Sequence, residues 1–113
     1  MLALLLAGAV QSQIWFTRQQ HDQTTDIVTH ARSAQTCECS YSVSVNKTGP
    51  SGTSRTTQQQ DVTLTAGQDQ ALSTLRFTLA PQDKVHISVK LYQGDTLLSE
   101  AQTQIPDIAS KQH

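Results

Sequence analysis

Residues 84–92 read KVHISVKLY, and this stretch decides the fold because its side chains alternate between apolar and polar without interruption. The apolar positions stand two residues apart, at Val85, Ile87, Val89 and Leu91. Successive side chains of an extended chain point to opposite sides, so the segment has one apolar and one polar face. The pattern predicts a β-strand whose apolar face lies in a protein core.

The same alternation recurs on both sides of this stretch. It is clearest in Thr74–Leu79 and Cys37–Val45, and weaker strands are predicted at Ile14–Gln20, at Thr25–Ser33, around Val62 and Leu64, and at Thr96–Gln104. Thr is abundant, and its β-branched side chain favours strands over helices.

Turn residues separate these segments. Ala80–Asp83 contains a proline, and Gly94–Asp95 is predicted to form a hairpin turn. Asn46–Gly52 (NKTGPSG) is predicted to be a loop from its turn residues alone. About seven strands without a helix predict an all-β chain, folded as an immunoglobulin-like sandwich of two antiparallel sheets. A small closed barrel is the alternative architecture.

The chain has 113 residues and a formal net charge of −1, with 15% charged residues. This length suits one domain, and the weak charge argues against nucleic acid or an anionic membrane surface as a partner. The apolar run Leu2–Val10 is too short to cross a bilayer, and it resembles the core of a secretory signal. We therefore predict a signal peptide over residues 1–12, a β-sandwich domain over 13–105 and a flexible tail over 106–113. After cleavage of the signal we expect no membrane insertion.

Cys37 and Cys39 are the most distinctive chemical feature of the sequence. On a regular strand both side chains point to the same face, about 6.6–6.8 Å apart, whereas a disulfide needs Cβ atoms near ~3.8 Å. Closing the bridge would require a bulge, a bend or a fraying strand end. Two separate buried thiols are therefore the favoured interpretation, and a redox pair is the alternative. Glu38, between the two, offers no cation that would activate a thiolate.

The sequence predicts no catalytic, metal or cofactor site. Cys-x-Cys is not the usual spacing of zinc ligands, and the histidines are scattered at His21, His30, His86 and His113. No Ser-His-Asp arrangement or phosphate-binding loop is present.

Two polar surfaces are candidates for binding. Ser54–Asp61 (SRTTQQQD) is predicted to be a solvated edge strand or loop, and in its functional form it would engage other amide-rich β-chains. A mildly basic outer face is predicted from Arg76, Lys84, His86 and Lys90. A merely solvated surface is the simpler interpretation of both.

The order of features along the chain resembles the curli assembly protein CsgC family. The features are a short leader that runs into Gln13, Ile14 and Phe16, a Cys-x-Cys strand after a Thr-rich one, a Gly-Ser-Gly type loop at Gly49–Gly52, a Gln-rich strand, an Ala-Leu-x-x-Leu segment at Ala71, Leu72 and Leu75, and a corner with Pro81, Asp83 and Val85. The resemblance covers about residues 13–104.

This resemblance implies a periplasmic protein, not an enzyme, that keeps the curli subunit from forming amyloid before it is secreted. Its partners would be the major curli subunit and the curli secretion channel, bound by a monomer without cofactors. The family's Cys-x-Cys falls on Cys37 and Cys39, which carries a second hypothesis, a thiol–disulfide redox partner in curli secretion.

Overall fold

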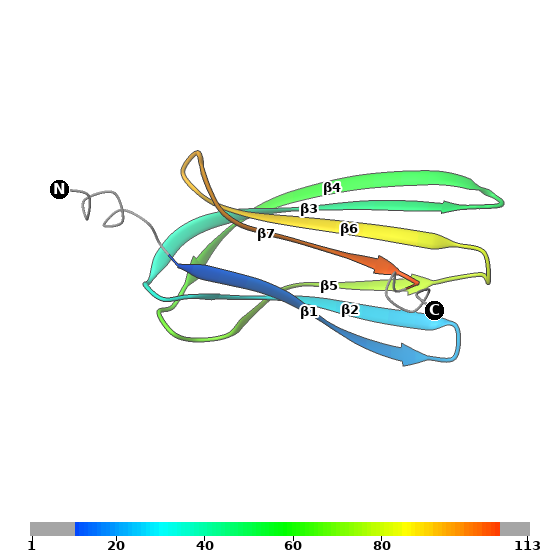
Figure 1. The fold of residues 1–113 in the computed structure, drawn as a ribbon, viewed down its shortest axis with the longest axis horizontal. Helices are drawn as coiled ribbons and strands as arrows, with labels where there is room; N and C mark the ends of the chain where they lie inside the picture. Colours follow the sequence, from blue (N-terminus) through cyan, green and yellow to red (C-terminus); the bar gives the residue numbers. More distant parts are fainter. Residues whose placement is uncertain (1–10, 107–113) are drawn as a thin grey trace, which may run out of the picture.

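The computed structural model describes residues 11–106. In this range the chain forms seven β-strands joined by short connections (Figure 1). They are β1 (Ser12–His21), β2 (Thr24–Ser33), β3 (Cys37–Gly49), β4 (Gly52–Leu64), β5 (Gln70–Thr78), β6 (Lys84–Gln93) and β7 (Thr96–Ile105). The predicted all-β class and strand number are confirmed.

The strands form two antiparallel sheets that pack face to face. One sheet has the order β1-β2-β5 and the other β4-β3-β6-β7, and Figure 1 shows the four-stranded sheet lying over the three-stranded one. The predicted two-sheet sandwich is therefore confirmed. Within residues 11–106, no helix is long and apolar enough to cross a membrane.

The central strands of the larger sheet supply most of the core. Val85, Ile87, Val89 and Leu91 of β6 are each 0% exposed, as the alternation of KVHISVKLY predicts. Burial of one such side chain stabilises a fold by about 1.5–3 kcal/mol. The inward side chains of β3 pack beside them, and Ile27, Ala31 and Leu64 complete the buried cluster.

The predicted loop at Asn46–Gly52 is wrong. β3 runs on to Gly49 and β4 starts at Gly52, so only Pro50 and Ser51 remain as the turn. From Asn46 to Thr48 each residue of β3 faces a partner on both sides; Thr48, for example, pairs with Thr53 of β4 and with Lys84 of β6. Ladder pairing on both sides outweighs the local turn preference of this segment.

Asp83 holds this long hairpin against the corner between β5 and β6. Its carboxylate accepts a hydrogen bond from the Ala80 N–H at 2.9 Å and lies 3.9 Å from the Lys47 ammonium. A Cβ on Gly49 would overlap the Asp83 side chain. A side chain at position 49 would therefore have to displace the Asp83 carboxylate from its contacts with Ala80 and Lys47.

The two lateral sides of the sandwich are closed differently. On the β1/β7 side, the hydroxyls of Ser12 and Ser99 hydrogen-bond each other, and the Arg18 guanidinium donates to the Gln104 carbonyl at 3.1 Å. On the other side, the buried Tyr41 hydroxyl reaches across to the Leu72 carbonyl of β5 at 2.7 Å. Beyond that contact lies β4, the edge strand of the larger sheet, whose side chains from Gly52 to Asp61 are exposed.

The predicted signal peptide and tail lie outside the described residues, apart from Gln11, Ser12 and Pro106. Both segments remain predictions.

Candidate functional site

The two cysteines at the start of β3 form a disulfide bond. Cys37 is 1% exposed and Cys39 is 6% exposed, and both side chains point into the sandwich. The predicted inward burial is therefore confirmed, but the favoured interpretation of two separate thiols is wrong. Their Cα atoms are 5.5 Å apart, closer than the ~6.6–6.8 Å of a regular strand.

The position of the pair explains how the bridge closes. Cys37 and Cys39 are paired only with β4, because the pairing of β3 with β6 begins at Ser40. A strand end that is bonded on one side can contract more easily than a strand held on both sides. The predicted requirement for a strand end is thus met without a break in the register with β4.

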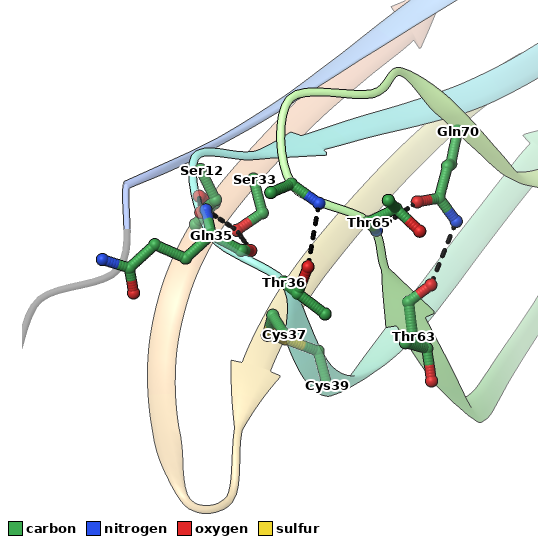
Figure 2. The surroundings of a disulfide bond; sticks show 11 residues. Ser12, Ser33, Gln35, Thr36, Cys37, Cys39, Thr63, Thr65 and Gln70 are labelled. Atoms are coloured by element: carbon green, nitrogen blue, oxygen red, sulfur yellow. Dashed lines mark hydrogen bonds between the residues drawn. A yellow bond between two sulfur atoms is a disulfide. The ribbon is translucent and has the colours of Figure 1, made fainter.

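Polar contacts hold the chain segments around the disulfide (Figure 2). The Thr36 hydroxyl accepts the Ala66 N–H at 3.2 Å. The Gln70 side-chain amide accepts from the Thr65 N–H at 2.6 Å and donates to the Thr63 carbonyl at 3.1 Å. These hydrogen bonds fix the connection between β2 and β3 and the connection between β4 and β5, which both lie next to the disulfide.

A hollow of about 580 Å³ opens beside Cys39. Its lining includes the carboxylates of Glu38, Asp61 and Asp95. The species that attacks a disulfide is a thiolate, and three carboxylates repel an approaching anion. Both the burial of the sulfurs and the charge of the hollow therefore disfavour rapid exchange.

The predicted basic residues do not form one face. Lys84, His86 and Lys90 lie on the polar face of β6, in the four-stranded sheet. Arg76 lies on β5, on the outer side of the other sheet, where its guanidinium donates to both carboxylate oxygens of Asp26 at 2.7 and 3.1 Å.

The Asp26–Arg76 pair neutralises the charge of Arg76 locally. The hydrogen bond from Arg76 lowers the pKa of the Asp26 carboxyl, and the hydrogen bond to Asp26 raises the pKa of Arg76. Lys90 also faces an acid, since Glu100 of β7 stands directly opposite in the register. The basic character of the β6 surface is correspondingly small.

The exposed surface of the larger sheet is a ladder of hydroxyl and amide side chains. We call it the outer face, and its members are Thr53, Arg55, Thr57, Gln59 and Asp61 of β4, Ser40, Ser42, Ser44, Asn46 and Thr48 of β3, Lys84, His86, Ser88, Lys90 and Tyr92 of β6, and Glu100, Gln102 and Gln104 of β7. Hydrogen bonds link neighbouring strands: Arg55 donates to the Asn46 side-chain carbonyl at 2.9 Å, and His86 lies 3.1 Å from Gln102 Oε1. Cross-strand pairs of this kind stabilise a sheet without an apolar surface.

β4 differs from the other strands because both of its faces are in water over most of its length. All residues from Gly52 to Asp61 are exposed, and only Val62 and Leu64 near its end reach the core. The predicted solvated segment Ser54–Asp61 is therefore an edge strand rather than a loop.

The histidines do not come together. His21, His30 and His86 lie on β1, β2 and β6, and His113 is outside the described residues. Between residues 11 and 106, no group of three His, Cys, Asp or Glu side chains is arranged to hold a metal ion. Sequence reasoning missed one contact: Trp15 stacks on His30, with ring centroids 5.5 Å apart, and the two residues are direct partners in the register of β1 and β2.

Comparison with known proteins identifies the family. The chain matches the family model described as thin aggregative fimbriae synthesis protein, Tafi-CsgC, over residues 4–103. The chain belongs to this family. The predicted resemblance is thereby confirmed.

Curated members of the Tafi-CsgC family are similar over most of the chain. The curli assembly protein CsgC of Escherichia coli O1:K1 is 35% identical over 97 residues, which cover 86% of this chain and 88% of that protein. CsgC of Salmonella typhimurium strain LT2 is 31% identical over 97 residues, which cover 86% of this chain and 90% of that protein. This chain is thus similar over most of its length to proteins that are named for curli assembly.

Solved structures agree with the fold. The E. coli curli protein CsgC superposes with a TM-score of 0.72 at 30% identity, covering 85% of this chain and 99% of that one. The solution structure of CsgH from R. palustris superposes with a TM-score of 0.63 at 17% identity, covering 83% of this chain and 90% of that one, and it bears on the fold alone.

Proposed function

We propose that this protein acts in the periplasm as a chaperone-like inhibitor, which binds the major curli subunit transiently and delays its polymerisation into amyloid. The observation that carries the proposal is the outer face, a broad β-surface of hydroxyl and amide groups on a member of a curli assembly family. Contact with the curli secretion channel belongs to the same proposal.

The physical argument concerns nucleation. A cross-β nucleus grows because unpaired strand edges and amide-bearing side chains recruit further chains. A folded sandwich with a polar β-surface can contact those groups without extending the stack, because its remaining strands are already paired within its own two sheets. Lys84, His86 and Lys90 contribute to the contacting surface in this proposal, whereas Arg76 lies on the other sheet and is already paired.

Thioflavin fluorescence of the purified subunit tests the proposal directly. Substoichiometric amounts of the folded chain should lengthen the lag phase, and an equal amount of an unrelated β-sandwich protein should not. An unchanged lag would refute the inhibitory function. Fractionation of cells that carry the full gene, with periplasmic and cytoplasmic marker proteins, tests the location.

A thiol–disulfide function is the second candidate, because the closed bridge supplies the disulfide that such a reaction needs, although burial of the sulfurs and the acidic hollow slow its exchange. In such a reaction a partner dithiol would give two electrons and two protons to the Cys37–Cys39 disulfide, leaving two thiols here and a disulfide on the partner. Replacing both cysteines by serine separates the candidates. The redox function requires complete loss of activity in that variant, whereas inhibition by binding should persist if circular dichroism shows that the fold survives.

A further inference from the structure

β4 is an edge strand whose outward backbone groups are unpaired. It is the terminal strand of the larger sheet and pairs with β3 along its entire length, from Gly52 opposite Gly49 to Leu64 opposite Cys37. Among residues 11–106, no strand pairs with its other side. A row of free N–H and C=O groups of this kind is a template for a further strand.

The usual protection of such an edge is absent from β4. Proteins shield edges with short strands, prolines, bulges or charges. β4 has 13 residues, contains no proline and keeps an unbroken register with β3. Its only charged residues are Arg55 and Asp61, and the segment between them is the uncharged run TTQQQ.

The remaining edges are less accessible to a new strand. β1 and β7 contact each other through Ser12 and Ser99 and through Arg18 and the Gln104 carbonyl. The pairing of β5 with β2 is interrupted by a register shift at Thr29/His30. The pairing of β7 with β6 is likewise interrupted by a register shift at Leu91/Tyr92. The long, regular and unshielded edge is β4.

Exposure on both faces decides which strand fits. Because Thr56, Gln58 and Gln60 on one face and Thr57 and Gln59 on the other are all in water, a strand added beside them would also have both faces in water. An apolar strand would gain no burial there. A strand rich in amides and hydroxyls would gain backbone hydrogen bonds together with side-chain ladders of the kind found in amyloid.

We propose that residues Thr53–Asp61 of β4, which we call the β4 edge, are the docking site for an extended amide- and hydroxyl-rich segment of the curli subunit, added as a fifth strand of the larger sheet. This inference rests on the proposed inhibitory function and locates it on the molecule. A subunit whose segment is bound to β4 cannot use that segment to pair with other subunits in an amyloid nucleus.

The test places lysines on the edge, since edge lysines block strand addition. The variant Thr57→Lys/Gln59→Lys is compared with Thr17→Lys/Gln19→Lys, which makes the same residue changes at the same spacing at exposed positions of β1. Both variants are first shown by thermal unfolding to be folded. In the thioflavin assay, the β4 variant should lose the lag extension and the β1 variant should keep it.

The outcomes separate the two proposals. If the unaltered chain fails to extend the lag, the inhibitory function falls and the docking site falls with it. If the unaltered chain is active and both variants keep or both lose activity, the function stands and the β4 edge is refuted. Amide NMR signals give an independent readout: added subunit monomer should perturb residues 53–61, and perturbation confined to other strands overturns the site.

A second copy of the chain is the competing occupant. Antiparallel pairing of two β4 strands about Gln58 would set Arg55 of each copy opposite an acidic residue of the other. Sedimentation at increasing concentration distinguishes this case. A dimer that the β4 variant abolishes, together with loss of inhibition as the dimer forms, would assign the edge to self-association instead of client binding.

Discussion

Tyr41 offers the sharpest test of how the β4 side of the sandwich is held. Its side chain is 5% exposed, and its hydroxyl lies 2.7 Å from both the Gln60 side-chain oxygen and the Leu72 carbonyl. This group therefore joins β3 to the edge strand and to the opposite sheet. Tyr41→Phe removes the hydroxyl while keeping the ring, and it leaves the Leu72 carbonyl without this partner.

The expected loss is about 1–2 kcal/mol, the net value of one hydrogen bond plus part of the desolvation of the carbonyl. For a domain of this size, each kcal/mol lowers the melting temperature by ~4–8 °C. Urea unfolding followed by circular dichroism measures the loss. Tyr92→Phe on the outer face is the matched control and should change stability by less than about 0.5 kcal/mol.

The pH dependence provides a second readout of the same hydroxyl. Burial raises the pKa of Tyr41 above the ordinary tyrosine value of about 10. The unfolded chain then loses this proton first, so the contribution of Tyr41 to stability is complete below pH about 10 and is lost as the pH rises through the folded pKa. The stability gap between the wild type and Tyr41→Phe should narrow above pH about 10. Equal urea midpoints at neutral pH, or a gap that widens in alkali, would refute the reasoning.

Further predictions concern the hairpin, a buried hydroxyl and an ion pair. Gly49→Ala should destabilise the fold by about 1–3 kcal/mol because the new methyl group overlaps Asp83, and Gly49→Ala/Asp83→Ala should recover part of that loss in urea titrations. Thr29→Val should leave stability unchanged or raise it by up to about 1 kcal/mol, because the Thr29 hydroxyl is buried without a hydrogen-bond partner among the described residues; a clear loss in calorimetry would contradict this. The hydrogen bond from Arg76 lowers the pKa of Asp26, so the contribution of this pair is present above pH about 4 and is lost as the pH falls through the folded pKa. In Asp26→Asn the free energy of unfolding should therefore fall less steeply as the pH is lowered below about 4. An unchanged dependence on pH would argue against a contribution from the Asp26–Arg76 pair.

The strands of the core could be predicted from the sequence because burial imposes a strict alternation on them. KVHISVKLY lies in the middle of a sheet, with one face against the core, so its pattern carries the structure directly. The fate of Asn46–Gly52 could not be predicted, since its extended form depends on pairing with β4 and β6 rather than on its own residues.

The candidate site was harder to predict for a similar reason. The cysteine bridge depends on Cys37 and Cys39 lying where β3 is bonded on one side only, which is a property of sheet order and not of spacing. The separation of Arg76 from Lys84 and Lys90 likewise follows from which sheet each strand joins. The polar composition of Ser54–Asp61 did indicate exposure, but exposure on both faces depends on the place of β4 at the edge of the larger sheet, which the composition does not give.

The exposure of β4 on both faces also means that its residues are under little constraint from folding. Apart from Gln60, which accepts a hydrogen bond from the Tyr41 hydroxyl, the side chains between Gly52 and Asp61 make no contact of this kind with the core, so substitutions among uncharged polar residues there should be nearly neutral for stability. Under the proposed docking on β4, selection could therefore alter which client segments this strand prefers while the core stays intact. In laboratory evolution, a library confined to these positions would yield folded variants at high frequency, and client preference could be changed within a scaffold of constant stability.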